Sequence, residues 1–172
     1  MILGLSAGFH DAGATVVDRK GNILFAGHSE RYSGIKFDKN LNQEFIDDAM
    51  SYGRPTSVAW YENTWLKRTR QIYSGEWRKA IDFSTLPKNL VYPYIKQRGL
   101  LPKTQKLSIK SYGHHKCHAA AGFQTSPYSN AISIVVDAIG EWDTISVWEC
   151  SYKPTYLGKP TAQYKKLSLI HI

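Results

Sequence analysis

Apolar residues gather in three short runs at the start of the chain, and these runs predict three β-strands. The runs cover residues 2–6, 14–18 and 23–30 and are rich in Ile, Leu and Val, which favour strands. Residues 19–22 form a tight hairpin turn in which Gly21 supplies a permissive backbone. Strands joined by such short connections pair antiparallel, so the N-terminus predicts an antiparallel meander.

After the meander, the apolar positions change to the helical period of 3.6 residues. Residues 42–53 place four apolar side chains on one helical face and predict a helix. Residues 56–62 are typical of a strand. Residues 63–81 predict a second helix, which begins at Asn63 and is weakened by Gly75.

The segment 82–106 contains Pro87, Pro93 and Pro102. Because proline removes a backbone donor and interrupts regular structure, we expect an irregular insertion here. A short strand is expected at 106–112.

The second half of the chain predicts one helix and three strands. The helix runs from about residue 114 to 125, and the strands cover 131–137, 144–150 and 162–172. Residues 138–143 are the turn between the first two of these strands. The chain is therefore predicted to be an α/β protein, with a mixed sheet, an N-terminal antiparallel meander and flanking helices.

Length and composition fit one compact domain over residues 1–172, or a large part of a bigger domain. Hydrophobic residues make up 42% of the chain and charged residues 21%, as in folded domains. The last apolar strand ends without a cap, turn or polar tail, so we expect the sequence to be part of a longer protein. Two cysteines, no apolar run of bilayer length and no basic signal-peptide region favour the cytoplasm and argue against a membrane partner.

The net charge of +8 is concentrated in residues 65–79 and 96–110. Such stretches favour either binding of nucleic acid or an anionic substrate, or a solvated helix face and loop. The solvated surface is the more common case, and nucleic acid is not expected as a partner. The Trp and Tyr residues between positions 60 and 77 would serve core packing equally well.

The sequence GHHKCHAA contains the strongest candidate for chemistry. His114 and His118 are four residues apart, so on a helix their imidazoles lie on one face, one turn apart. This spacing suits two ligands of one divalent metal. Asp137 follows an apolar strand and opens a turn that contains glycine, which makes it the candidate third ligand.

Another interpretation of this cluster stays open, because isolated histidine pairs also occur as surface or capping residues. As metal ligands, two His and one carboxylate would leave coordination positions open for a substrate. His115 points about 100° away from the pair by helical geometry, which favours packing, support of the ligands or contact with substrate. Cys117 also lies off the face of the pair.

Two connections between strands have a composition that suits phosphate. Residues 6–15 and 137–144 each contain glycine and an acidic residue. Small residues let backbone N–H groups approach phosphate oxygens, and nearby carboxylates can hold Mg²⁺ through water. Facing each other across a cleft, two such turns would bind a nucleotide; taken singly, each is a common β-turn.

Further candidates lie in the first loop and after the third strand. His10 is a candidate general base that Asp11 or another carboxylate would orient, or a turn residue that bonds within its own loop. Glu30, Arg31 and Lys36 are candidates for contact with an anionic donor, although an exposed loop is the favoured explanation from these residues alone.

Three blocks of the sequence together resemble a known family. They are ILGLSAGFHDAGATVVD at 2–18, ERYSGIKFD at 30–38 and HHKCHAAAGFQTSPYSNAISIVVDAIGEWDT at 114–144. In order and spacing they are similar to the N-terminal domain of the nodulation-protein and antibiotic-biosynthesis O-carbamoyltransferases. Residues of about 45–110 contain no motif that we can assign to the family.

The resemblance implies a ribonuclease H-like fold of the hexokinase and actin type, related to the ATPases that attach threonylcarbamoyl groups to tRNA. It implies that carbamoyl phosphate and ATP first give a carbamoyl-adenylate in a second, C-terminal domain. The N-terminal domain then transfers the carbamoyl group to a hydroxyl of a small molecule.

The resemblance also implies individual roles. His114, His118 and Asp137 match the ligands of a metal, iron first and zinc or manganese as alternatives, that acts as a Lewis acid. His10 matches a histidine beside the transferred carbamoyl group. The residues assigned to the nucleotide side, with ATP and Mg²⁺, are Asp11, Lys36, Gly140 and Glu141.

The sequence departs from the family in two ways. Ala138 stands where the family usually has Gly, and its Cβ would crowd a nucleotide if the backbone there had a positive φ. The family protein is several times longer, so a further ligand Asp and the adenylate-forming domain are expected from a missing C-terminal half, in cis or in trans. We therefore expect that this polypeptide alone does not catalyse the full reaction.

Two alternatives stay open. An ATPase or sugar kinase of the same fold would not need the metal pair on the helix. A non-enzymatic basic module would bind nucleic acid with a strong dependence on salt, or would bind a partner protein.

Overall fold

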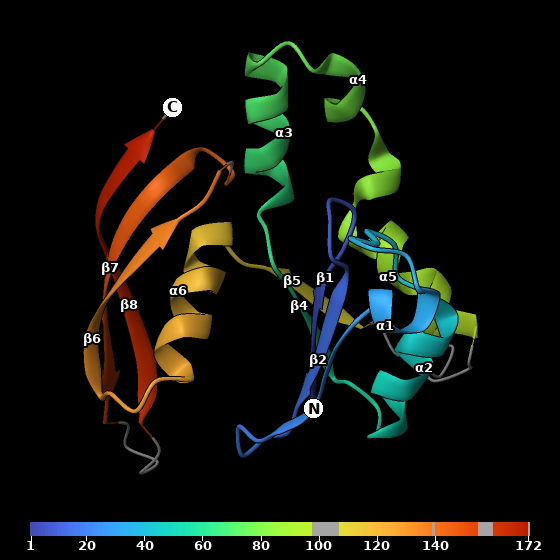
Figure 1. The fold of residues 1–172 in the computed structure, drawn as a ribbon, viewed down its shortest axis with the longest axis horizontal. Coiled ribbons are helices and arrows are strands. Elements are labelled where there is room, and N and C mark those ends of the chain that lie inside the picture. The colour runs from blue at the N-terminus through green and yellow to red at the C-terminus, as the bar shows by residue number, and fades with distance from the viewer. Residues whose placement is uncertain (98–106, 139, 155–159, 172) are drawn as a thin grey trace. The chain divides into compact units, whose positions relative to one another are not determined.

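The described residues of the computed structural model form two compact units (Figure 1). The first unit consists of Met1–Thr64 and Ile81–Ser111, and the second of Trp65–Ala80 and Tyr112–Ile172. The structure describes residues 1–97, 107–138, 140–154 and 160–171.

A mixed five-stranded sheet forms the centre of the first unit. Its strands lie in the order β3-β2-β1-β4-β5. The first three strands of the chain pair antiparallel, whereas β4 pairs parallel with β1 and β5 parallel with β4. The predicted meander and mixed sheet are therefore confirmed. The bounds are β1 Ile2–Ser6, β2 Gly13–Val17, β3 Ile23–His28, β4 Ser57–Trp60 and β5 Ser108–Ser111.

Helix α2 (Gln43–Ser51) covers this sheet with the face that the helical period predicts. Its four apolar residues are buried in one core with Leu3, Val16 and Val58 of the sheet. These residues of α2 are Phe45, Ile46, Ala49 and Met50.

Asn42 begins α2 and also ties it to the end of β3. Its side-chain oxygen accepts from the Phe45 N–H at 2.8 Å, and its amide donates to the Ser29 hydroxyl at 2.9 Å. We expect Asn42→Ala to lower the free energy of unfolding by about 1–2 kcal/mol, the usual cost of losing such a cap. Asn42→Asp keeps the acceptor and loses only the amide donor, so it should cost less. Urea denaturation measures both variants, and equal losses would contradict the capping role.

The third strand ends two residues earlier than the sequence predicts. Glu30 begins the short helix α1 (Glu30–Ser33) instead of ending β3. The reason is local, because the Ser29 carbonyl accepts from the N–H groups of Tyr32 and Ser33.

The predicted irregular insertion at 82–106 is wrong in its first part. The structure has the 3₁₀ helix η1 (Phe83–Thr85) followed by α5 (Pro87–Gln97). Pro87 is the first helical residue, where a missing N–H costs nothing. Val91 and Ile95, four residues apart, are both buried in the core of the first unit, and this burial holds the helix despite Pro93 inside it. Residues 98–106 lie outside the described part of the chain.

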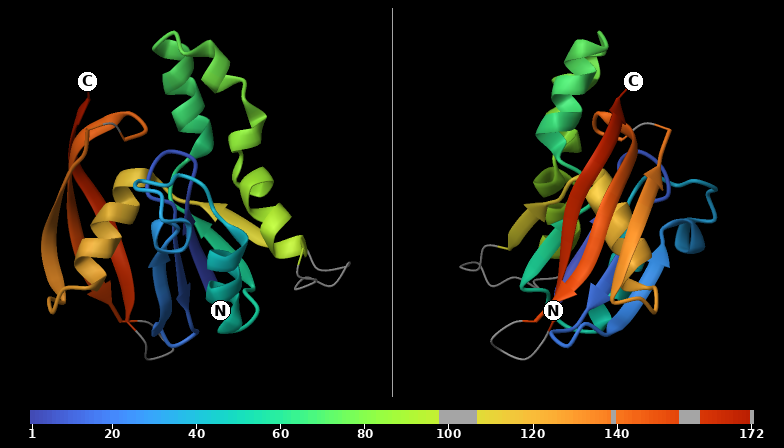
Figure 2. Two further views of the ribbon diagram at one scale, coloured as in Figure 1. Left: turned by 45° about the vertical axis from the view of Figure 1, so that its right-hand side comes forward. Right: turned by 90° about the vertical axis from the view of Figure 1, so that its left-hand side faces the viewer.

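The second unit is an antiparallel sheet with α6 against one face, as Figure 2 shows. Ala119 and Phe123 of α6 pack on Val135, Trp148 and Cys150 of the sheet. The strand order is β6-β7-β8, and the predicted helix and three strands are confirmed. Their bounds are α6 His114–Gln124, β6 Asn130–Val136, β7 Asp143–Lys153 and β8 Thr161–His171.

The first basic stretch, residues 65–79, lies in helices α3 (Thr64–Tyr73) and α4 (Trp77–Ala80), which Gly75 separates with a φ of 79°. Trp60 lies in the core, so the packing interpretation holds for this residue. It does not hold for the exposed aromatic residues of the two helices, Trp65, Tyr73 and Trp77. In the part of the chain that the structure describes, no helix is both long and apolar enough to cross a bilayer.

Candidate metal centre

The histidine pair lies at the beginning of α6, where helical spacing brings the two rings together. Gly113 precedes the helix and offers no side-chain cap. The Glu141 carboxylate takes that place and accepts from the His114 N–H at 3.3 Å. The rings of His114 and His118 meet edge to face, with centroids 4.6 Å apart and an interplanar angle of 84°.

Asp137 approaches the two histidines from the end of β6. Its N–H donates to the Thr144 carbonyl at 2.8 Å, which closes the turn between β6 and β7. Its Oδ2 lies 2.7 Å from His114 Nε2 and 3.9 Å from His118 Nε2. The two Nε2 atoms are 3.1 Å apart. The structure thus brings the three candidate ligand atoms together.

The spacing and chemistry of these atoms fit a shared cation. Ligand atoms about 2.1 Å from a tetrahedral or octahedral metal lie about 3.0–3.4 Å apart, and the distances of 2.7, 3.1 and 3.9 Å bracket that range. A neutral imidazole nitrogen either donates or accepts, so a single proton on His114 Nε2 cannot serve Asp137 and His118 equally well. Two imidazoles and a carboxylate suit Fe²⁺, Zn²⁺ or Mn²⁺.

The protonation states in the cluster also suit metal binding. Burial lowers the pKa of His118, and the neighbouring His114 lowers it further. Burial raises the pKa of Asp137, but the hydrogen bond with His114 and the charges of both histidines outweigh it, so the net shift is downward. Near neutral pH the cluster presents a neutral His118 and an ionised Asp137, which are the forms that bind metals.

His115 and Cys117 both lie away from the three ligand atoms. His115 is buried, with Nδ1 2.7 Å from Ser146 Oγ, and the Trp148 indole donates to the same oxygen at 2.7 Å. Burial lowers the pKa of His115, which favours the neutral ring. Burial raises the pKa of Cys117 to about 11, so its thiol stays protonated near neutral pH and is a poor ligand.

Gly140 and Glu141, the candidates for the nucleotide side, both have structural contacts in this unit. Glu141 caps α6 through the His114 N–H. A Cβ built on Gly140 would lie 2.7 Å from His115 Nε2 and 2.7 Å from the Asp143 carbonyl oxygen. Packing alone therefore demands glycine at position 140.

We expect Gly140→Ala to lower the free energy of unfolding by about 1–3 kcal/mol, because the added Cβ meets backbone as well as a buried ring. Gly122→Ala in α6 is the matched control, since a Cβ there meets nothing within 4 Å. The control should gain up to about 1 kcal/mol, because alanine is the better helix former. Urea denaturation measures both, and a neutral Gly140→Ala would mean that the turn has room for a side chain.

In the first unit, His10 and Asp11 lie in the loop between β1 and β2. His10 Nδ1 is 2.8 Å from Asp11 Oδ2, so both predicted partners meet within their own loop. Asp11 and Phe37 have φ values of 46° and 57°, in a region that is uncommon outside glycine and that clusters at functional sites. Ala138 is not among the described residues with positive φ. The condition under which its Cβ would crowd a nucleotide is therefore not met.

The loop of His10 is joined to the loop that contains Lys36. The Ala12 N–H donates to the Asp38 carbonyl at 2.7 Å, and the Gly8 N–H donates to the Lys39 carbonyl at 2.8 Å. Lys36 itself is exposed, with its ammonium 5.0 Å from the centroid of the Phe37 ring. The structure therefore brings these two candidate loops side by side.

Glu30 and Arg31 have a different environment from Lys36. The Glu30 carboxylate accepts from the Phe37 N–H at 3.1 Å and thereby fixes the loop. Both residues line a surface depression of about 330 Å³ with Ala26, Gly27 and His28. Lys36 does not line it, so the three candidates do not converge on one ligand position.

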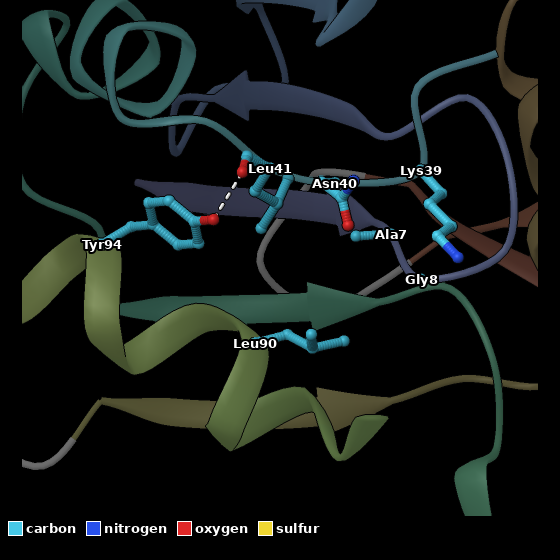
Figure 3. A pocket seen from close by; sticks show the side chains of 7 residues that line it. All are labelled: Ala7, Gly8, Lys39, Asn40, Leu41, Leu90 and Tyr94. Carbon is cyan, nitrogen blue, oxygen red and sulfur yellow. Dashed lines mark hydrogen bonds between the residues drawn. The ribbon is translucent and has the colours of Figure 1, made fainter. Parts of the chain in front are cut away.

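A smaller pocket in the first unit lies beside the same loops (Figure 3). The Tyr94 hydroxyl donates to the Leu41 carbonyl at its edge. Its volume of about 50 Å³ is far below the roughly 300 Å³ at which small-molecule sites begin, so it does not hold a nucleotide. Its lining residues are Ala7, Gly8, Lys39, Asn40, Leu41, Leu90 and Tyr94.

Asp38, which joins these loops, should give the stability a dependence on pH. Its hydrogen bonds with the Asn40 N–H and then the Ser33 hydroxyl hold its pKa below the ordinary value of 3.8. A lowered pKa stabilises the fold above the unfolded-state value, and this contribution is lost as the pH falls through the folded-state value. We expect the difference in Tm between wild type and Asp38→Asn to be constant from about pH 5 to 8 and to shrink below about pH 4. A difference that persists at low pH in thermal denaturation would contradict this.

Ser146 and Trp148 lie behind the cluster and are not among the residues predicted from the sequence. The available signal was a serine within the apolar strand at 144–150, two positions before a tryptophan. Residues two apart point to the same face of a strand, so a hydroxyl and an indole on the face that meets a helix would have been expected to bond to something.

Fold and cluster together define an α/β protein with a candidate metal centre. The chain belongs to the carbamoyltransferase N-terminus family, whose model matches residues 1–157 of the 172. The matched region includes the loop of His10 and all three candidate ligands. Membership supports a general role in carbamoyl transfer.

One relative among curated proteins is an uncharacterized protein, sll1178, of Synechocystis sp. (strain ATCC 27184 / PCC 6803 / Kazusa). It is 27% identical to the chain over 165 residues. The match covers 86% of this chain and 27% of that protein, so the chain spans about a quarter of the length of this relative.

Proposed function

We propose that the chain provides the transfer site of an O-carbamoyltransferase, which moves a carbamoyl group from carbamoyl-adenylate to a hydroxyl of a small molecule. The observation behind this proposal is the convergence of His114, His118 and Asp137, whose facing side-chain atoms lie 2.7 to 3.9 Å apart, in a member of a carbamoyltransferase family. The adenylate is made from carbamoyl phosphate and ATP, with Mg²⁺.

In the proposed step, the acceptor oxygen bonds to the carbamoyl carbon and the bond from that carbon to the phosphate oxygen of AMP breaks. AMP leaves with the bonding electron pair, and the hydroxyl proton must go to a base. His10 suits this task, because Asp11 bonds to its Nδ1 and leaves Nε2 to take the proton.

The cluster of His114, His118 and Asp137 would hold a divalent cation, iron first and zinc or manganese as alternatives. When bound, such a cation supplies Lewis-acid stabilisation of negative charge on the adenylate. Asp11, Lys36, Gly140 and Glu141 are each proposed for the nucleotide side.

We further propose that the first unit has a ribonuclease H-like fold. The supporting observation is the strand order β3-β2-β1-β4-β5, with an antiparallel meander followed by two strands parallel to β1. Function is argued from the site and not from this likeness of fold.

The remaining parts of the enzyme are proposed to come from a second polypeptide segment, in cis or in trans. In support, the chain matches only 27% of its longer relative. We propose a cytoplasmic location, where ATP and carbamoyl phosphate are available, without a membrane or nucleic acid as partner.

Metal analysis and ligand binding test this function. The chain, purified without added metal, should contain about one equivalent of iron, zinc or manganese by mass spectrometry. The loaded chain should bind a sulfamoyl analogue of carbamoyl-adenylate in calorimetry, and His10→Ala should leave the metal content unchanged. Binding of ATP without any metal in the chain would favour an ATPase or kinase, and salt-dependent binding of generic DNA would favour a basic module.

A further inference from the structure

Behind the first turn of α6 lies a set of buried polar side chains that the proposed function does not use. His115, Ser146 and Trp148 are 4%, 0% and 8% exposed. Ser146 and Trp148 are two residues apart on β7 and therefore point to the same face of the sheet, the face on which α6 packs. Polar groups buried this deeply mostly have hydrogen-bond partners, and these three bond to one another.

The three side chains are joined by two short hydrogen bonds. An indole Nε1 only donates, so Ser146 Oγ accepts from Trp148 at 2.7 Å. The same oxygen bonds to His115 Nδ1 at 2.7 Å, as donor or as second acceptor according to the tautomer of the ring. The other ring nitrogen, His115 Nε2, has no hydrogen-bond partner among the described residues.

His115 Nε2 faces the turn that begins with Asp137. A Cβ built on Gly140 would lie only 2.7 Å from this atom, so the edge of the ring rests against the Gly140 backbone. The next residue of the turn, Glu141, accepts from the His114 N–H. His115 therefore contacts both β7 and the turn between β6 and β7, and it adjoins His114 in α6.

We propose that His115 is a positioning residue: its ring, bonded to Ser146 and packed on Gly140, fixes the distance between His114 and Asp137. Even a small rotation of α6 would disturb the distances between the ligands. A rotation of α6 by about 10° moves an atom about 6 Å from the helix axis by about 1 Å, whereas metal–ligand distances tolerate only about 0.2 Å. The inference rests on the proposed metal centre.

Four variants and Co²⁺ as the probe test this role. His115→Phe keeps the ring and removes both nitrogens, and His115→Asn restores an acceptor near the position of Nδ1. Ser146→Ala removes a single oxygen. Trp148→Phe removes the indole donor and some core volume and is the control, because it leaves both members of the bond between His115 and Ser146 in place.

We expect His115→Phe to weaken Co²⁺ binding 10- to 100-fold, the usual effect of removing a residue that orients metal ligands. It should also change the visible d–d spectrum, which reports coordination geometry. Ser146→Ala should follow in the same direction, His115→Asn should recover part of the affinity, and Trp148→Phe should stay within about threefold of wild type. Circular dichroism of the metal-free proteins checks that each variant is folded. If His115→Phe does not fold, Ser146→Ala decides the question alone.

Unchanged Co²⁺ affinity and spectrum in folded His115→Phe and Ser146→Ala would overturn the proposal. If the wild-type chain itself does not bind Co²⁺, the metal centre is wrong, and amide hydrogen exchange of the metal-free proteins then decides the role of His115. Faster exchange at His114 and Gly140 in His115→Phe than in Trp148→Phe would support it, and equal exchange would overturn it.

Discussion

His114→Ala should weaken the binding of Co²⁺ or Fe²⁺ by about 100-fold or more, because removing a residue that only supports the ligands already lowers metal affinity 10- to 100-fold. His114 is the central member of the cluster, with its Nε2 2.7 Å from Asp137 Oδ2 and 3.1 Å from His118 Nε2. Asp137→Asn should have a comparable effect, since it keeps the shape of the side chain but removes the charge that binds the cation. Calorimetric titration of the metal-free chain measures both affinities.

The matched control is His28→Ala. His28 is an exposed histidine in β3 of the first unit, so its loss removes an imidazole without touching the cluster. The metal affinity of His28→Ala should equal that of wild type. If folded His114→Ala bound the metal within threefold of wild type, His114 and His118 would be the surface or capping pair that the sequence alone also allows.

The parts of this site that sequence predicted are the parts that local geometry determines. The four-residue spacing of His114 and His118 fixes one face of a helix, whatever the rest of the fold does. Asp137 could be placed because the apolar run before it ends at a turn. Strand and turn patterns of this kind depend on neighbouring residues, and the meander from residue 2 to 28 was predictable for the same reason.

The contacts behind the cluster depend on residues far apart in the sequence. Position 140 requires glycine because the ring of His115, 25 residues earlier, occupies the space of a Cβ. The composition of the turn at 137–144 suggested instead that its backbone N–H groups bind phosphate, and that role stays a prediction. The bond between His115 and Ser146 was equally hidden, because a strand pattern does not say which face meets a helix.

Helix α5 was missed because tertiary packing overrides local preference. Pro87 and Pro93 argue against a helix when the segment is considered alone. In the folded unit, Val91 and Ile95 enter the core with the residues of the sheet, and their burial outweighs the cost of the proline inside the helix. The signal that the sequence offered is the four-residue spacing of these two apolar side chains.

The other large effect is expected on the free energy of unfolding, from a substitution in the hydrophobic core of the first unit. Phe45→Ala should lower the free energy of unfolding by about 3–5 kcal/mol, the usual cost of removing a fully buried phenylalanine. The Phe45 ring is 0% exposed and lies 5.1 Å from the Tyr32 ring and 5.9 Å from the Phe25 ring, between centroids. Even a Cβ on Gly27 would come within 3.2 Å of it, so the surroundings are already close-packed and will collapse little around a cavity.

Two further variants separate cavity formation from loss of an aromatic ring. Phe45→Leu keeps most of the volume and should cost less than about 1.5 kcal/mol, while Phe83→Ala removes an exposed ring and should change the free energy by about 0.5 kcal/mol or less. Urea denaturation at neutral pH ranks the three. A loss below about 1 kcal/mol for Phe45→Ala would mean that α2 does not close this core.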